Sequence, residues 1–227
     1  MPKFIVADDH PLFRGALVQA LEQHFKMADI VQAEDVESLQ KQVQENNDAD
    51  LLLLDLHMPG ASGFSGLIFI NGQYPHIPVM VVSANEQASI IHQAIDYGAA
   101  GFLPKSSPPE MIGSAIEQVL QGDIWLPANL PPADQVDNDD KAAIAEVVAS
   151  FTPQQFRVAN MLADGLLNKQ IAYEMDVTEA TVKAHLTAIF RKLGVHSRTQ
   201  AVLAMNQLNL SPPQLDSCPP AHSETGP

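Results

Sequence analysis

Acidic and polar side chains follow several short apolar runs of this sequence. Asp8 and Asp9 come directly after the first run, and Asp55 follows four consecutive leucines. Ser83 and Lys105 stand at the ends of two further runs. An aspartate can simply open a turn, and a lone serine or lysine is more often a turn residue or a surface charge. Because carboxyl ends of parallel strands meet at the sheet edge where ligands bind, the five together predict one functional site.

The chemistry that suits these residues is phosphoryl transfer. Three crowded carboxylates repel one another, and a hard divalent cation with oxygen ligands relieves that repulsion, so we expect Mg²⁺ here. A cation beside a carboxylate, a lysine ammonium and a serine hydroxyl can stabilise a transferring phosphoryl group. Asp55 would be the nucleophile that accepts this group.

The elements that must position these residues alternate between strand and helix. Apolar runs of strand length are followed five times by apolar residues at helical spacing. The predicted strands are 4–7, 30–31, 51–54, 78–82 and 101–103, and the predicted helices are 11–21, 36–43, 64–71, 86–97 and 108–120. This alternation predicts a flavodoxin-like (βα)5 doubly wound parallel sheet with strand order 2-1-3-4-5. That order places strands 1, 3, 4 and 5 side by side, so the acids would share one pocket.

Composition narrows the class of protein. The 227 residues are enough for two domains, and the single cysteine, Cys218, excludes an internal disulfide and a cysteine metal cage. The sequence has neither a long apolar run nor a signal-peptide pattern, so we expect no membrane span, no export and a cytoplasmic protein. The net charge of −15 is uneven: residues 1–128 carry −11 and residues 151–210 carry +2. This asymmetry suits a DNA-binding module joined to an acidic domain.

A second domain is predicted to begin near residue 151. Thr152 as N-cap, Pro153 at the first helical position and Gln155 form a capping box, flanked by Phe151 and Phe156 as a hydrophobic staple. Residues 127–140 are rich in Pro, Asn and Asp, which is typical of a tether, and residues 141–149 are expected to add a short linker helix. The chain after residue 210 has five prolines and no apolar run, so we expect it to be disordered.

The second domain carries a helix-turn-helix pattern. Asn168 is expected to cap a short helix, and Thr178 to cap a longer helix that closes at Gly194. A fourth helix follows a further capping box that begins at Ser197, which makes a small all-α four-helix domain. The outer face of the third helix carries small and basic residues that suit the major groove. The alternative is that this is the solvent-exposed polar face of an ordinary helical bundle, but such a face would usually carry more Glu than this helix does.

The first region resembles the receiver domain of two-component response regulators. The acid pair at 8–9, the segment 54–60 around the acceptor, Ser83-Ala84 and the segment 98–105 match that family. The resemblance implies that Asp9, Asp55 and the main-chain carbonyl of His57 bind Mg²⁺, with Asp8 acting through water. It also implies that Ser83 and Lys105 contact the phosphoryl oxygens and that Phe102 is a switch residue coupled to Ser83. A sensor histidine kinase would be the phosphoryl donor.

The second region resembles the LuxR-type DNA-binding domain of the NarL/FixJ class. Thr152-Pro153, Asn168-Lys169, the segments 181–183 and 192–195, and 197–199 carry much of the match. The resemblance implies that double-stranded promoter DNA is bound by Lys169, Thr181, Lys183, Ala184, Thr187, Arg191 and Lys192. It implies a homodimer, on phosphorylation or DNA binding, through the outer face of the fourth helix around Leu203 and Gln207.

We therefore expect a transcriptional response regulator and not an enzyme. It would comprise a receiver (1–126), a linker (127–150), a DNA-binding domain (151–210) and a disordered tail (211–227). An aspartate-nucleophile phosphatase would share the acid-rich strand ends, but position 57 is His where such an enzyme needs a second acid. A quorum sensor would share the second domain but would need an acyl-ligand pocket in place of the acids.

The resemblance also implies how the two domains communicate. In relatives of this class the unphosphorylated receiver covers the recognition helix, and the opposite charges of the two domains favour such a closed state. Phosphorylation would draw Ser83 toward the phosphoryl group and let Phe102 turn inward. The altered face, formed by the fourth helix, fifth strand and fifth helix, would then release the DNA-binding domain.

Overall fold

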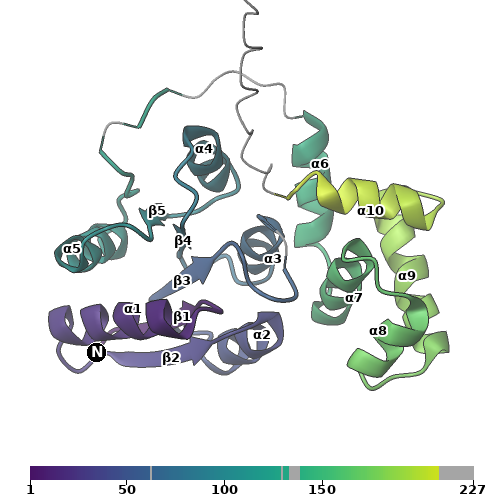
Figure 1. Cartoon of the computed structure of the whole chain (residues 1–227), viewed down its shortest axis with the longest axis horizontal. Coiled ribbons are helices and arrows are strands. Elements are labelled where there is room, and N and C mark those ends of the chain that lie inside the picture. Colours follow the sequence, from purple (N-terminus) through teal and green to yellow (C-terminus); the bar gives the residue numbers. More distant parts are fainter. Residues whose placement is uncertain (62, 129, 133–138, 210–227) are drawn as a thin grey trace, which may run out of the picture.

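The computed structural model describes residues 1–61, 63–128, 130–132 and 139–209 (Figure 1). Its first region contains one parallel sheet with the order β2-β1-β3-β4-β5, as predicted. The strands are β1 (Lys3–Ala7), β2 (Asp29–Ala33), β3 (Leu51–Asp55), β4 (Val79–Ser83) and β5 (Gly101–Pro104). Every residue of β3 is buried, which accounts for its uninterrupted leucines: a strand inside a parallel sheet has helices over both faces.

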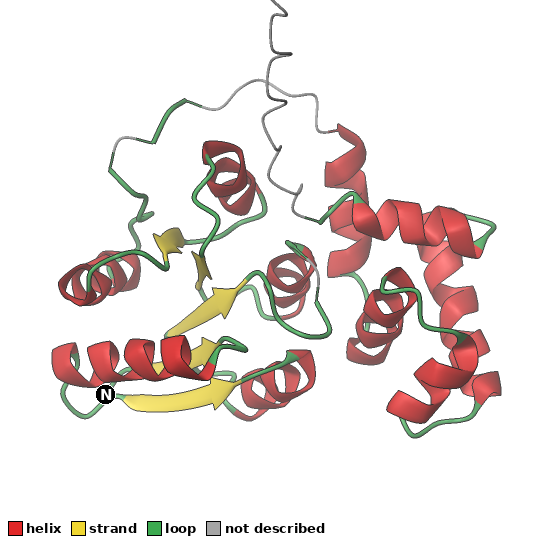
Figure 2. Ribbon diagram, viewed as in Figure 1, coloured by secondary structure: helices red, strands yellow, loops and turns green. Residues whose placement is uncertain are grey.

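Five helices cover the two faces of this sheet (Figure 2). They are α1 (Pro11–His24), α2 (Val36–Glu45), α3 (Ser65–Gln73), α4 (Ala88–Asp96) and α5 (Pro109–Leu120). Leu51 and Leu53 point into the core beneath α1 and α5, whereas Leu52 and Leu54 point toward α2, α3 and α4. Helix α4 begins two residues later than predicted, because the side chain of Asn85 accepts from the backbone N–H of Gln87 and forms a turn there.

The second region is wholly helical in its described part. Its helices are α6 (Asp139–Ala149), α7 (Pro153–Ala163), α8 (Asn168–Glu174), α9 (Glu179–Leu193) and α10 (Arg198–Asn206). The capping box that opens α7 is confirmed, since Thr152 and Gln155 exchange hydrogen bonds of 3.2 and 3.3 Å. The N-cap of α8 is Leu167 and not Asn168, whose side-chain oxygen instead accepts from Arg198.

Local chemistry also fixes the ends of α9, the longer helix of the predicted helix-turn-helix unit. Thr178 caps its start by accepting from the N–H of Thr181, and Gly194 ends it in the left-handed conformation at φ 67°. Residues 211–227, predicted to be disordered, lie outside the described residues. Among the described residues, no helix is both long enough and apolar enough to cross a membrane.

Candidate functional site

The predicted acids meet at the carboxyl edge of the sheet. Asp8 and Asp9 follow β1, and Asp55 ends the adjacent β3, so the parallel pairing of these strands brings the carboxylates together. Asp8 and Asp55 are buried, and Asp9 is partly exposed. One ligand atom from each of Asp8, Asp9, His10 and Asp55 lies within 4.8 Å of the others, so the cluster could hold a metal ion.

Lys105 joins this cluster from the end of β5. Its Nζ lies 2.7 Å from Asp8 Oδ2 and 2.8 Å from Asp55 Oδ2, and 4.9 Å from the centre of the Phe13 ring. Burial alone would lower the pKa of this ammonium, but the Asp55 and Asp8 carboxylates outweigh burial and raise the pKa above its ordinary value. Lys105 is therefore a fixed positive charge beside the acceptor.

Two oxygens of the cluster fit a metal because they are buried without a hydrogen bond. Asp8 Oδ2 and Asp9 Oδ1 accept none from the described residues, although each faces a cationic or basic side chain at ion-pairing distance. Asp8 Oδ1 is already used by the N–H of His10, and Asp55 Oδ1 by the N–H of His57. Converging carboxylate oxygens of this kind match the ligands that Mg²⁺ prefers.

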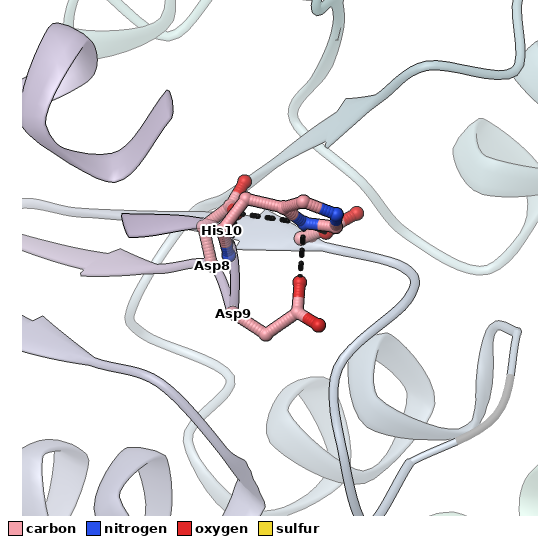
Figure 3. Close-up of side chains that lie close together, drawn as sticks. Asp8, Asp9 and His10 are labelled. Atoms are coloured by element: carbon pink, nitrogen blue, oxygen red, sulfur yellow. Dashed lines mark hydrogen bonds and ion pairs between the residues drawn. The ribbon is translucent and has the colours of Figure 1, made fainter. Parts of the chain in front are cut away.

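His10 belongs to the site, although our sequence interpretation gave it no role. Its Nδ1 lies 2.5 Å from Asp9 Oδ1 and 3.5 Å from Asp8 Oδ1 (Figure 3). The same Nδ1 lies 4.0 Å from Asp55 Oδ2. One feature of the sequence could have indicated this role: His10 directly follows the acid pair Asp8-Asp9, at the N-cap of α1. About two thirds of the side chain is exposed, so the ring lies at the open side of the cluster.

Ser83 and Phe102 lie where the sequence places them, on neighbouring strands. Ser83 is fully buried, and its Oγ accepts from the N–H of Asn85 at 3.2 Å. Phe102, paired with Val81, is also fully buried. Phe102 is thus already in the inward position that we expected only after phosphorylation.

The predicted DNA-facing side chains of α9 lie on its open face. Lys183, Ala184, Thr187 and Arg191 are exposed, while the apolar residues between them face the core. Lys169 on α8 is exposed as well, and Thr181 is half-buried with its Oγ1 2.9 Å from that of Thr178. In this structure the receiver does not cover these four residues of α9, in contrast to the closed state that we expect of the unphosphorylated chain.

Lys192 differs from the other predicted DNA contacts. Its Nζ donates to the carbonyl of Ser150 at 2.8 Å and to Gln155 Oε1 at 2.9 Å, and it lies 5.6 Å from the centre of the Phe151 ring. The ammonium is directed to the start of α7 and away from the open face of α9. These contacts give Lys192 a structural task within the domain.

Comparison with known families agrees with this combination of folds. The model of the "Response regulator receiver domain" matches residues 4–117, and that of "Bacterial regulatory proteins, luxR family" matches residues 149–205. The chain belongs to the transcriptional response regulators that join a receiver domain to a LuxR-type DNA-binding domain.

Individual relatives share nearly the full length of the chain. The "Glycerol metabolism activator" of Pseudomonas putida is 40% identical, over 93% of this chain and 98% of that protein. The nitrate/nitrite response regulator NarL of Escherichia coli (strain K12) is 29% identical, over 89% and 94%. The fold matches the structure of RcsB from Salmonella enterica serovar Typhimurium, bound to promoter rprA, with TM-score 0.54, 22% identity and coverage of 92% and 100%.

Proposed function

We propose that Asp55 is the phosphoryl acceptor of this regulator and that the reaction requires Mg²⁺. The observation that carries the proposal is the convergence of three carboxylates and one lysine ammonium at a single sheet edge. Asp9, Asp55 and the main-chain carbonyl of His57 would hold the ion directly, and Asp8 through water. The ion supplies positive charge that offsets the repulsion between the carboxylates and an incoming phosphoryl anion.

Side chains of the receiver would carry out the other steps of phosphoryl transfer. A carboxylate oxygen of Asp55 attacks phosphorus, and the bond from phosphorus to the donor breaks, with the electron pair leaving on the donor. Lys105 Nζ, already held beside Asp55, would contact a phosphoryl oxygen, and the Ser83 hydroxyl would contact another after leaving the N–H of Asn85. A sensor histidine kinase is the proposed donor in the cytoplasm, and the chain acts as a regulator without an enzymatic reaction of its own on other substrates.

The DNA-binding role rests on the open face of α9. We propose that Lys183, Ala184 and Thr187 reach base edges, while Lys169, Thr181 and Arg191 lie near the phosphates. The outer face of α10 around Leu203 and Gln207 is exposed and is the proposed homodimer surface. The 40% identity to an activator of glycerol metabolism makes promoters of glycerol genes the first candidates for its targets.

Phosphorylation with acetyl phosphate tests the acceptor. We expect intact-mass analysis to show one added phosphoryl group when Mg²⁺ is present and none when it is chelated. Asp55→Asn should abolish the modification, and the matched Asp123→Asn variant, which changes an exposed acid away from the cluster, should be modified normally. Normal modification of Asp55→Asn, or modification that is indifferent to chelation, would contradict the assignment.

A further inference from the structure

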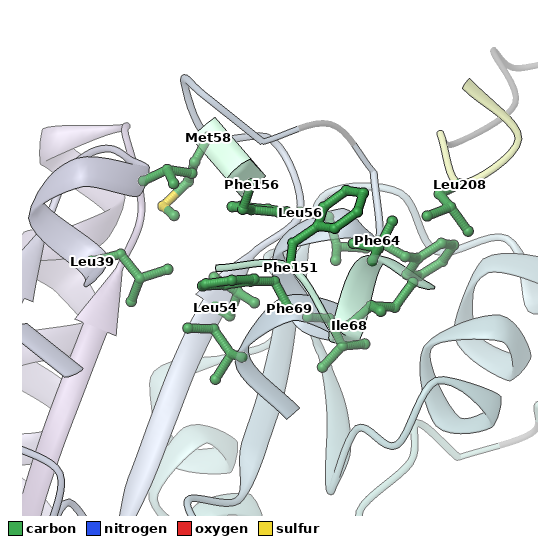
Figure 4. Close-up of a cluster of buried hydrophobic side chains, with 14 of the residues drawn as sticks. Leu39, Leu54, Leu56, Met58, Phe64, Ile68, Phe69, Phe151, Phe156 and Leu208 are labelled. Carbon is green, nitrogen blue, oxygen red and sulfur yellow. The ribbon is translucent and has the colours of Figure 1, made fainter. Parts of the chain in front are cut away.

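The α3 face of the receiver is occupied by the second region of the chain. The ring of Phe69 on α3 stacks on that of Phe156 on α7, with centroids 4.2 Å apart and an interplanar angle of 14° (Figure 4). The N–H of Phe64, just before α3, donates to the carbonyl of Leu208 at 3.0 Å. All four of these apolar side chains are buried in one hydrophobic cluster that is continuous across both regions.

Buried polar contacts make this docking specific. Ser65 Oγ lies 3.3 Å from Asn160 Oδ1, and both residues are 1% exposed. The side-chain N–H group of Asn160 also donates to the carbonyl of Phe156, so the asparagine is held from within α7 while it meets α3. Misalignment of the two helices would break this buried hydrogen bond, so the pair favours one relative position of α3 and α7.

Gly72 allows the linker helix α6 to lie against α3. A Cβ added at Gly72 would lie 2.5 Å from the carbonyl oxygen of Ala149 and 2.6 Å from its Cβ. The adjacent Gln73 donates its side-chain N–H to the same carbonyl at 3.0 Å. Since no real Cβ makes contacts this short, any side chain at position 72 must push the two helices apart.

The docked face begins directly beyond the acceptor. Leu56 and Met58, which follow Asp55 in the chain, are buried in the cluster that holds Phe156. The rim carries an ion pair between Glu37 on α2 and Arg157 on α7, with 2.6 Å between the atoms. The loop after Asp55 therefore contacts the second region without passing through α4, β5 and α5.

The docked arrangement leaves the DNA-binding surfaces open. The outer face of α9 is exposed, and Leu203 on the outer face of α10 is 61% exposed. Phe102 is buried in the same structure, the position that we associate with the phosphorylated receiver. Docking on α3 is thus compatible with DNA contact, dimer contact and the inward switch residue together.

We propose that the α3 face of the receiver is a docking surface that holds the DNA-binding domain in its DNA-competent arrangement, and that phosphorylation of Asp55 strengthens this docking through Leu56, Met58 and Phe64. The inference rests on the proposed function, because it takes Asp55 as the acceptor. Regulation would then act by fixing the position of the recognition helix and not by uncovering it. In this mechanism docking carries the coupling free energy between the phosphorylation site and the DNA-binding surface. A substitution that weakens docking should therefore also reduce the effect of phosphorylation on DNA affinity.

Gly72→Ala in the full chain tests the proposal, with Gly15→Ala as its matched control. Both changes add a methyl group within a receiver helix, but nothing lies within 4 Å of a Cβ at Gly15. The DNA probe is a duplex selected from a random library with the beryllofluoride-activated wild-type chain. We expect Gly72→Ala to enlarge the radius of gyration in solution scattering and to weaken binding of the activated chain about tenfold, a typical coupling between sites. Gly15→Ala should match wild type in both measurements.

A charge exchange at the rim keeps the test independent of any folding defect at Gly72. Glu37→Arg should weaken binding in the same direction but less, because the pair is partly exposed. Adding Arg157→Glu should restore binding. Tighter DNA binding by Gly72→Ala would mean that docking inhibits DNA binding. A larger radius of gyration with unchanged DNA affinity would mean that docking has no effect on DNA binding. Either result overturns the proposal. Failure of beryllofluoride to bind the wild-type chain would instead contradict the phosphoryl-acceptor site.

Discussion

At the scale of single residues, the acid cluster holds more negative than positive charge. Lys105 compensates Asp8 and Asp55, but among the described residues the ion pair of Asp9 is with His10 alone. We therefore expect Mg²⁺ to raise the melting temperature, by the equivalent of about 2.7 kcal/mol when its concentration is a hundred times the dissociation constant. Asp9→Asn should remove most of this response and should stabilise the metal-free protein, because it relieves repulsion.

Thermal unfolding at increasing Mg²⁺ concentration checks this expectation. Asp164→Asn is a suitable control, since it makes the same change at the end of α7, in the other domain. The control should respond to Mg²⁺ as wild type does. An undiminished Mg²⁺ response in Asp9→Asn would show that the ion is held elsewhere.

Lys192 provides a second prediction at this scale. Because its ammonium donates to Ser150 and Gln155, Lys192→Met should lower the free energy of unfolding by about 1–2 kcal/mol. DNA affinity at a temperature where the variant is folded should fall little. Urea denaturation and a binding titration separate the two effects; a large loss of affinity without a loss of stability would restore Lys192 as a DNA contact.

At the scale of elements, the third helix of the second domain should enter the major groove. Lys183 is exposed at its open face, so Lys183→Ala should weaken specific binding by about 1–3 kcal/mol if the side chain reads a base. If Lys183 contacts only phosphate, the substitution should weaken binding to the specific duplex and to the random duplex by the same factor. Lys41→Ala, which removes an equally exposed lysine from α2 of the receiver, is the charge-matched control. Unchanged affinity for both duplexes would exclude α9 from the groove.

Most elements could be predicted because their signals are local. The leucines before Asp55, the capping box at Thr152 and the glycine that ends α9 each specify structure within a few residues, and the structure confirms them. The strand order then brought the acids and Lys105 together. The position of Lys192 could not be predicted, since it depends on where the start of α7 lies relative to the end of α9.

At the scale of the whole molecule, the docking of the two regions had no sequence signal at all. Gly72 reads as an ordinary glycine near the end of a helix, and its close approach to Ala149 exists only in the assembled fold. Phe69 and Phe156 each have the pattern of a core residue of their own domain, yet they stack on one another. Local patterns place side chains on faces, but they do not state which face of one domain meets the other.

The shared hydrophobic cluster predicts that the two regions unfold together. Phe69 is 1% exposed in the cluster that spans both regions, whereas Phe4 is fully buried in the cluster on the α1 and α5 face of the receiver. Changing either phenylalanine to alanine should lower the free energy of unfolding by about 3–5 kcal/mol through lost burial and the cavity left behind.

Calorimetry tests whether the two regions unfold together. Wild type should unfold in one transition whose calorimetric and van't Hoff enthalpies agree, as cooperative unfolding requires. Phe4→Ala should lower the temperature of that single transition, but Phe69→Ala should split it, because only the latter removes a contact between the regions. Two transitions in the wild-type chain, or equal behaviour of the two variants, would show that the domains unfold independently despite the stacked rings.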